Sequence, residues 1–319
     1  MTNAPRTRRS VAACIATLLA SLATGVQAAE PVKLNIAMVP VLDAEPFLYA
    51  QSRGYYKEAG LEVTFSTNDS GPAVVTGVLN GSYDAAAAAW FPVAIAISKG
   101  AKLKYVLTAS TVGKGPGQGH SGIVVKPDSP IKGYMDLEGK TVATNALTSL
   151  TTLATAIEMK AAGADPAKVK FSALPFKTAL QAVAQGQVDA AVVVSPFQTE
   201  GELAGLRLIG DPIRDAMPAD GAGLVLFTSE TSAAQKAAAL AAFTQATLRA
   251  GGELKANPEL QRRVAQDVIG LPADVARKVP LPGIANRPIN ADALQRQLDA
   301  AHAFGHLARP LKAADTLMR

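Results

Sequence analysis

Cysteine is almost missing from this 319-residue sequence, which has one copy, Cys14, near its N-terminus. The first 28 residues have the features of a secretory signal peptide: arginines, a short apolar run from Val11 to Ala23, and the small residues Val26 and Ala28 at a cleavage site. We expect cleavage after about Ala28 and export by the general or the twin-arginine route. The exported chain would contain no cysteine, which excludes disulfides, thiolate metal sites and a cysteine nucleophile.

An excess of one charge is also missing. The formal net charge of +5 includes Arg6, Arg8 and Arg9 of the predicted signal peptide, and without them 28 basic residues face 26 acidic ones. This balance gives no compositional support for binding nucleic acid. Beyond residue 30 no apolar run reaches membrane-spanning length, because Pro92 interrupts one such run and Lys99 ends it. We therefore expect an exported protein without a membrane span.

Histidine is scarce, and little in the sequence indicates catalysis. The three histidines are His120, His302 and His306. His302 and His306 are four positions apart on a predicted helix, a spacing that can share a metal, but no H-E-x-x-H or carboxylate pattern surrounds them. No Ser-His-Asp order, nucleophile elbow or paired-carboxylate signature is present. We predict no catalytic residue, no metal site and no cofactor, and His120 keeps no assigned role.

An internal repeat is the most informative feature that is present. The segments VVTGVLNGSYDAAAAAWFP and LQAVAQGQVDAAVVVSPF each contain a helix-like stretch, a glycine, an Asp-Ala pair and a run of small apolar residues. Gly81 and Gly186 are 105 positions apart, and so are Asp84 and Asp189. Glycine is favoured in the turn after a helix, and a run of Ala and Val is typical of a strand buried on both faces.

The sequence before each repeat also follows one order: strand, turn, helix, glycine, strand, with Gly60 and Gly163 after the helices. Each half therefore predicts an α/β lobe with a mostly parallel sheet flanked by helices. We predict that residues 29–112 begin lobe one, that 113–219 form lobe two, and that 220–319 complete lobe one and add C-terminal helices. A chain that crosses twice permits closure about a hinge, with a cleft between the lobes.

A glycine-rich run, GKGPGQGH from Gly113 to His120, lies at the first predicted crossing. A phosphate-binding loop would need Lys-Ser/Thr at its end and a helix directly after it, whereas both flanks here are strand-like. We interpret the run as a flexible connection between the lobes. The chain changes character again at residues 210–223, where we expect it to return to lobe one.

Short hydrogen-bonding side chains gather in TNALTSLTT, Thr144 to Thr152, where a predicted strand leads into a predicted helix. Ligands of parallel sheets bind at such turns, and the start of a helix attracts anions through its free N–H groups and its dipole. Asn145, Thr148 and Ser149 are candidate contacts, with Ser70-Gly71 at a turn of the other lobe. One helix needs only one cap, so the number of these side chains favours anion binding over capping alone.

Trp90, the one tryptophan, lies 105 positions before Ser195, and both follow a predicted small-residue strand. We predict that Trp90-Phe91 and Ser195 form facing rims of the cleft, with the indole ring against an alkyl or ring part of the ligand. The alternative is that Trp90 belongs to the core, as a lone aromatic often does.

Several phrases together resemble a known family. DLEGKTVATNAL, GADPAKVKF, LPF and ALQAVAQGQVDAAVVVSPF are similar to segments of the periplasmic solute-binding proteins for nitrate, sulfonate and taurine, and the resemblance runs from about Val32 to Phe197. It implies the two-lobed type II periplasmic-binding-protein fold and a monomeric, hinge-closing receptor that delivers a small-molecule solute to an ABC permease at the inner membrane. By position it implies ligand contacts at Asp43, Ser70, Gly71, Trp90, Phe91, Asn145, Thr148, Ser149 and Ser195.

The solute class stays open at this point. Relatives often carry an acidic residue before the Pro-Phe that here follows Ser195, and its absence favours an anion such as a sulfonate, taurine or nitrate over a cationic solute. The alternatives are an aromatic acid, a thiamine-precursor-like pyrimidine, delivery to a sensor in place of an importer, and a pyrimidine-synthase-like enzyme on the same fold.

Overall fold

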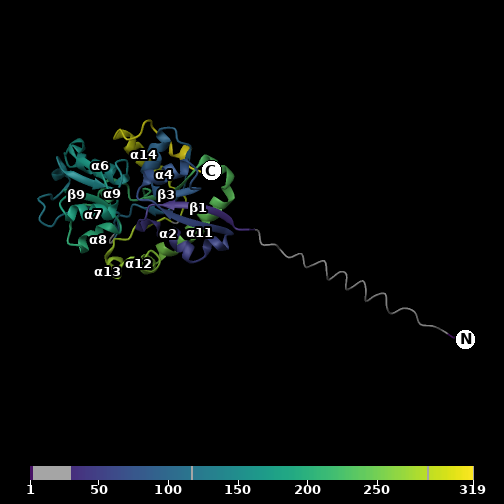
Figure 1. The fold of residues 1–319 in the computed structure, drawn as a ribbon. Coiled ribbons are helices and arrows are strands. Elements are labelled where there is room, and N and C mark those ends of the chain that lie inside the picture. Colours follow the sequence, from purple (N-terminus) through teal and green to yellow (C-terminus); the bar gives the residue numbers. More distant parts are fainter. Residues whose placement is uncertain (3–29, 116–117, 286, 319) are drawn as a thin grey trace. The chain divides into compact units, whose positions relative to one another are not determined.

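Two five-stranded sheets with their flanking helices account for most of residues Val32–Arg319 (Figure 1). The computed structural model describes residues 1–2, 30–115, 118–285 and 287–318. It separates the chain into a first unit, Met1–Pro31, and a second unit, Val32–Arg319. Residues 3–28 of the predicted signal peptide lie outside the described residues. Within the described ranges, no helix has both the length and the hydrophobicity that a membrane crossing requires.

The first sheet has the strand order β2-β1-β3-β11-β4. Strand β1 pairs in parallel with β2 and β3, whereas β11 pairs antiparallel with both β3 and β4. Four strands therefore run in one direction and β11 runs against them. The bounds are β1 Val32–Met38, β2 Leu61–Thr67, β3 Ala85–Ala89, β4 Leu103–Thr108 and β11 Leu224–Ser229.

The second sheet repeats this plan in the order β8-β7-β9-β6-β10. Strand β7 pairs in parallel with β8 and β9, and β6 pairs antiparallel with β9 and β10. The bounds are β6 Ser121–Val125, β7 Thr141–Thr144, β8 Lys170–Ala173, β9 Ala190–Val194 and β10 Arg207–Leu208. The predicted α/β class is confirmed, and each sheet is mixed because one interior strand runs against its neighbours.

The internal repeat corresponds to one structural unit that is used twice. Strands β3 and β9 begin 105 positions apart, at Ala85 and Ala190. Asp84, directly before β3, accepts a 2.8 Å hydrogen bond from the backbone N–H of Asn35 in β1. Asp189, directly before β9, accepts a 2.8 Å hydrogen bond from the backbone N–H of Thr141, the first residue of β7. The Asp-Ala pair therefore fixes the start of a buried strand against the next one, which is why it recurs.

Helices cover both sheets, and in Figure 1 the elements β9, α6, α7 and α8 lie together on one side, with β1, β3, α2 and α11 on the other. Those of the first lobe are η2 Leu42–Ala44, α2 Glu45–Ser52, α3 Tyr55–Glu58, α4 Gly71–Leu79, α5 Trp90–Ser98, α10 Glu230–Gln235 and α11 Ala237–Ala256. Those of the second lobe are η3 Tyr134–Leu137, α6 Leu150–Ala161, η4 Pro166–Lys168, α7 Phe176–Ala184, α8 Phe197–Leu203 and α9 Pro212–Ala216. The C-terminal part adds α12 Pro258–Asp267, α13 Ala273–Lys278, α14 Ala291–Ala303 and α15 Ala313–Thr316.

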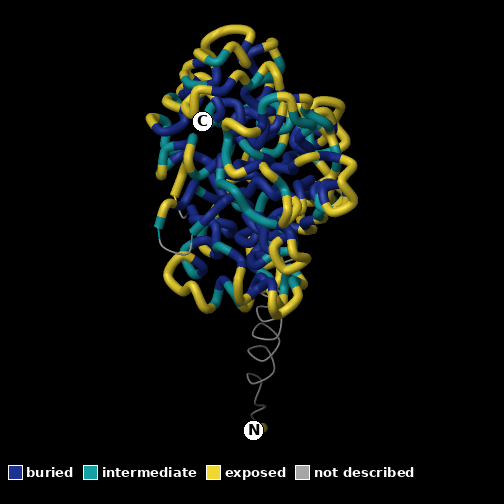
Figure 2. The backbone as a smooth tube through the Cα atoms, turned by 90° about the vertical axis from the view of Figure 1, so that its left-hand side faces the viewer, coloured by how far each residue is buried: buried dark blue, intermediate teal, exposed yellow. Residues whose placement is uncertain are grey.

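Buried residues fill the interior of both lobes, while exposed residues follow the outer turns (Figure 2). In the first lobe, Phe243 of α11 stacks on Tyr56 with a ring-centroid distance of 4.5 Å and lies 5.9 Å from the Phe47 ring. Helix α11 comes late in the sequence and α2 and α3 come early, so this aromatic contact ties the C-terminal part to the first sheet.

The chain crosses between the sheets twice. It passes to the second sheet between the short strand β5 Ser110–Thr111 and β6, and it returns to the first sheet between α9 and β11. Strand β12 Gly283–Ile284 pairs with β5 and continues from a segment that contacts the second lobe, where the Ser195 hydroxyl lies 3.4 Å from the Pro280 carbonyl oxygen.

We predict that Asp84→Ala lowers the free energy of unfolding by about 1–3 kcal/mol, because it removes a charge-assisted hydrogen bond to the strand neighbour. Asp84 is also paired at 2.8 Å with Lys236, and its side chain is 18% exposed. Urea unfolding measures the change. The control is Asp128→Ala, whose side chain is 77% exposed and which should change stability by less than about 0.5 kcal/mol. Equal effects of the two variants would contradict a stabilising role for the hydrogen bond between Asp84 and Asn35.

Candidate functional site

A cavity lies between the two sheets. Both lobes contribute to its wall, together with both crossings. The lining residues are Val39, Val41, Asp43, Gly71, Ala89, Pro92, His120, Asn145, Ser149, Leu150, Thr151, Phe176, Val194, Ile213, Gly223 and Leu224. Most of this lining is apolar, and among the residues that the structure describes it contains neither lysine nor arginine.

The position of the cavity follows from the direction of the strands. The parallel strands end at it, as Ala89 of β3 and Val194 of β9 show. Strands β6 and β11 run the other way, and their first residues pair with these last residues, Ser121 with Val194 and Leu224 with Ala89. The residues before β6 and β11 therefore reach the same cavity.

Four of the nine predicted contacts line the cavity: Asp43 and Gly71 from the first lobe, and Asn145 and Ser149 from the second. The structure thus brings the two predicted turns together. The Asn145 amide nitrogen lies 3.5 Å from the carbonyl oxygen of Asp69, in the other lobe. The predicted residues that do not line this cavity are Ser70, Trp90, Phe91, Thr148 and Ser195.

Three helices of the two lobes begin at the cavity wall. Gly71 is the first residue of α4, Phe176 is the first residue of α7, and Ser149 is the N-cap of α6. A side chain at position 71 would approach Pro92 Cγ to 2.6 Å, so glycine permits α4 and α5 to meet beside the cavity. Helix starts present free N–H groups and a partial positive charge, and here they converge without a lysine or arginine in the wall.

The hydroxyl cluster at the start of α6 is largely buried and bonded to itself. The Ser149 hydroxyl accepts a hydrogen bond from the Thr152 N–H and lies 2.6 Å from the Thr151 hydroxyl. The Thr144 hydroxyl lies 2.7 Å from that of Thr151, which in turn donates to the Asn145 side-chain oxygen. Capping and mutual bonding thus account for part of the cluster, while Ser149, Thr151 and Asn145 still reach the cavity wall.

Trp90 and Phe91 lie in the core of the first lobe. Trp90 is 0% exposed, begins α5, and packs edge-on against Phe91 with ring centroids 5.5 Å apart. The indole Nε1 has no hydrogen-bond partner within the described residues. Their neighbour Pro92 lines the cavity instead. The turn from β3 into α5 points the two aromatic side chains inward, so the placement gives the predicted rim contact no support and agrees with the core alternative.

The remaining predicted contacts lie around the cavity without lining it. Ser195 is fully buried and accepts a 2.6 Å hydrogen bond from the Gln198 amide. Thr148, one residue before the N-cap, is exposed, and Ser70 is half-buried as the N-cap of α4 without a side-chain cap bond.

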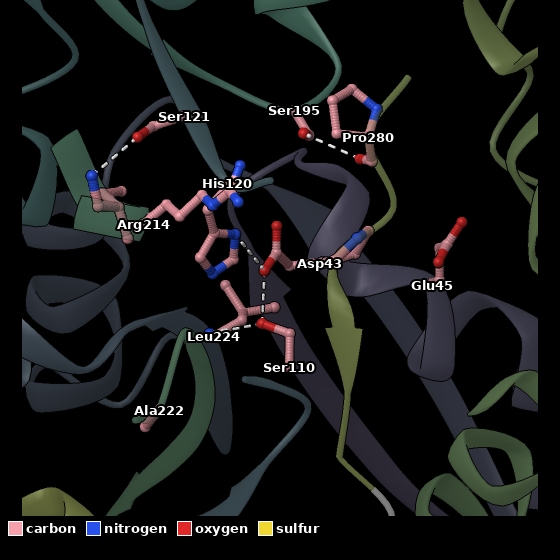
Figure 3. A network of polar contacts seen from close by, with 12 residues as sticks. Asp43, Glu45, Ser110, His120, Ser121, Ser195, Arg214, Ala222, Leu224 and Pro280 are labelled. Atoms are coloured by element: carbon pink, nitrogen blue, oxygen red, sulfur yellow. Dashed lines mark hydrogen bonds and ion pairs between the residues drawn. The ribbon is translucent and has the colours of Figure 1, made fainter. Parts of the chain in front are cut away.

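His120, to which the sequence gives no role, forms a buried pair in the cavity wall with the predicted contact Asp43 (Figure 3). Asp43 is 3% exposed and His120 is 5% exposed. The His120 Nδ1 atom lies 3.2 Å from Asp43 Oδ1, which also accepts a hydrogen bond from the Ser110 hydroxyl. Ser110 accepts in turn from the Leu224 N–H at 2.9 Å. The first crossing, the second crossing and η2 meet in this network.

Glu45, two residues after Asp43, is fully buried. Burial raises the pKa of its carboxyl well above the usual value; a 2.7 Å hydrogen bond from Gln261 opposes the shift, and the nearby charge of Asp43 adds to it. One carboxyl oxygen, Oε1, has no hydrogen-bond partner within the described residues. Across those residues, no group of three His, Cys, Asp or Glu side chains is placed to hold a metal ion.

These features define a class: two lobes joined by two crossings of the chain, with a cavity between them, which is the periplasmic-binding-protein fold. A family model described as NMT1/THI5 like matches residues 42–260, and the chain belongs to this family. The predicted family resemblance is thereby confirmed. No curated protein sequence gives a significant match.

Solved structures of periplasmic binding proteins share the fold. The alkanesulfonate-binding protein SsuA from Xanthomonas axonopodis pv. citri, bound to MOPS, has a TM-score of 0.75 and 22% identity, covering 91% of this chain and 99% of its own. The aliphatic sulphonate binding protein SsuA from Escherichia coli has a TM-score of 0.69 and 21% identity, covering 90% and 98%. The nitrate-binding protein NrtA from Synechocystis has a TM-score of 0.69 and 13% identity, covering 90% and 85%.

Gly223 provides a test of the wall beside His120. A Cβ at this position would lie 2.4 Å from His120 Nε2 and 2.6 Å from the Ser110 hydroxyl, and both groups are held by Asp43. We predict that Gly223→Ala lowers the free energy of unfolding by about 1–3 kcal/mol through overpacking. Gly252→Ala in α11, where a Cβ meets nothing within 4 Å, is the control and should not destabilise. Urea unfolding of both variants measures the change in stability. A Gly223→Ala variant as stable as the wild type would contradict the close packing of Gly223 against His120 and Ser110.

Glu45 predicts a pH dependence of stability. Because the folded-state pKa is raised, the folded protein keeps a proton that the unfolded chain releases above about pH 4.3. The stability contribution is full below that pH and is lost as pH rises towards the folded-state pKa. We expect Glu45→Gln to gain stability relative to the wild type as pH rises above about 4.3, measured by urea unfolding. Glu259→Gln, at an exposed position, should show no such trend, and a constant Glu45→Gln difference would contradict the prediction.

Proposed function

We propose that the protein is a periplasmic solute-binding receptor of an ABC importer, which captures a small organic anion in the cavity between its lobes. The observation that carries the proposal is the convergence of the α4, α6 and α7 starts on one cavity whose wall includes Ser149, Thr151 and Asn145. Helix N-termini and hydroxyls stabilise an anion without a formal countercharge. The fold and the family support the receptor class.

The rest of the wall favours an organic solute over a bare inorganic ion. Apolar side chains from both lobes, including Val39, Leu150 and Phe176, face the same space as the polar turn. Burying an alkyl or ring portion against such a wall is favourable, whereas nitrate has no apolar part to bury. The similar sulfonate-binding structures are consistent with a solute of this kind. A sulfonate or carboxylate head with an apolar tail fits both halves of the wall.

Closure of the lobes completes the proposed mechanism. The lobes that we propose, 29–112 with 220–319 and 113–219, contact each other at two places. The Asn145 amide lies 3.5 Å from the Asp69 carbonyl oxygen, and the Lys160 ammonium lies 4.8 Å from the Phe304 ring centroid. Rotation about the two crossings would open these contacts and admit the solute. Export, cleavage near Ala28, a monomeric state and docking on an inner-membrane permease belong to the same proposal.

A cationic pyrimidine is the second candidate, because Asp43 lines the cavity. Its carboxylate, however, already accepts from Ser110 and lies beside His120, so less of its charge is available to a ligand. A thermal-shift screen of alkanesulfonates, taurine, carboxylates, aromatic acids, nitrate and aminopyrimidines separates the candidates, since a ligand of the folded state raises the melting temperature. Turnover of a bound pyrimidine would instead identify an enzyme.

Ser149→Asp is the sharpest test of anion binding at the α6 start. Aspartate caps a helix as well as serine does, so the variant should fold, but it places a negative charge at the cavity wall. We expect affinity for the best anion of the screen to fall by about 100-fold or more, measured by calorimetry. Ser149→Asn, a neutral cap, is the matched control and should lose far less. Equal affinities of the two variants would remove this turn from the site.

A further inference from the structure

The internal repeat extends to the cavity wall, and there the two lobes differ. Helices α4 and α7 begin 105 positions apart, at Gly71 and Phe176, and both of these first residues line the cavity. The same spacing separates Ala89 and Val194, the last residues of β3 and β9, which line it as well. Equivalent positions of the two lobes therefore form one wall, with a bare glycine in the first lobe and a phenylalanine in the second.

A ring occupies this position in both lobes. A Cβ at Gly71 would lie 2.6 Å from Cγ of Pro92, so the Pro92 ring takes the place of the absent side chain, and Pro92 lines the cavity. In the second lobe Phe176 supplies a ring of its own. The solute cavity thus has the ring of Pro92 in the wall of the first lobe and the ring of Phe176 in the wall of the second.

Phe197 packs against the Phe176 ring. The two ring centroids are 5.2 Å apart, with an angle of 34° between the ring planes, and Phe197 is the first residue of α8. Only 6% of Phe176 is exposed. Phe197 comes 105 positions after Pro92, so the equivalent of the proline that lines the cavity supports Phe176 in the other lobe. A ring that is already held in place loses little conformational freedom when a ligand packs on it.

The wall also divides the solute into a polar and an apolar part. The proposed function assigns the anionic head to the turn of Asn145, Ser149 and Thr151. Among the lining residues that the structure describes, Phe176 is the one phenylalanine, tyrosine or tryptophan. An alkyl chain would gain from burial beside Phe176 and Pro92, whereas an aromatic ring would gain from burial and also from stacking on Phe176.

We propose that the solute is an aromatic anion, an arenesulfonate or an arenecarboxylate, whose ring packs between Pro92 and Phe176. Phe176 is then the residue that determines the preference for an aromatic over a saturated group. This inference rests on the proposed function and narrows it, since the head stays at the start of α6. Stacking of aromatic rings contributes beyond the buried area by an amount that corresponds to about twofold to tenfold in Kd.

The test compares anions that share a head and a number of carbon atoms: benzoate with cyclohexanecarboxylate, and benzenesulfonate with cyclohexanesulfonate. The saturated ring has the larger apolar surface, so burial alone would favour it. By calorimetric titration we expect the protein to bind the aromatic member about twofold to tenfold more tightly, and the pair with the lower Kd values identifies the head. Equal or weaker binding of the aromatic member in both pairs would overturn the inference and leave the proposed function intact. Binding of aminopyrimidines in place of any anion would overturn both.

Phe176→Leu separates stacking from burial. Leucine keeps an apolar side chain that is only somewhat smaller, so the variant should fold, but it has no ring. We expect the ratio of the two Kd values in a pair to fall to about one or below. Phe171→Leu, in β8 of the same lobe and outside the cavity lining, is the matched control and should keep the ratio of the wild type. An unchanged preference in Phe176→Leu would contradict the proposal.

Nuclear magnetic resonance tests the contact in the unaltered protein. We expect nuclear Overhauser effects between the ring protons of bound benzoate or benzenesulfonate and those of Phe176. The sequence has nine phenylalanines, and the signals of Phe176 are those that Phe176→Leu lacks. A saturated complex without these effects would overturn the inference.

Discussion

Each sheet has one interior strand that runs antiparallel to the other four strands, and the rest of the structure depends on these two strands. Strand β11 lies between β3 and β4, and β6 lies between β9 and β10. Interior strands must pair on both edges, because unpaired buried backbone groups are costly. The crossings are therefore fixed in place at both ends, and a cavity forms where the beginnings of β6 and β11 meet the ends of the parallel strands.

The antiparallel direction of β6 and β11 also determines which side chains line the cavity. Parallel strands lead into the helix starts that supply N–H groups, whereas β6 and β11 are preceded by His120 and Gly223. The wall therefore has a dipolar side, with Ser149 at the start of α6, and a titratable side, with Asp43 and His120.

The sequence predicts the fold further than the site. The 105-residue repeat marks the starts of β3 and β9 to the residue, because its aspartates have a direct structural task. The turns at Gly71 and Ser149 follow from the general position of ligands at strand ends. Local patterns do not tell which way a side chain points once a strand turns into a helix, so the sequence leaves both a rim position and a core position open for Trp90, which is buried in the structure. They also do not reveal that His120 and Asp43, far apart in sequence, meet across a crossing.

The insertion of β11 has a further consequence for the order in which the molecule is completed. All strands of the second sheet come from one continuous stretch, Ser121 to Leu208. The first sheet is complete only when β11, Leu224–Ser229, has inserted between β3 and β4. During synthesis, the second sheet can form from its own stretch while the first sheet still lacks β11. Pairing between strands that lie far apart in the sequence is slow, so we expect the first sheet to be completed after the second.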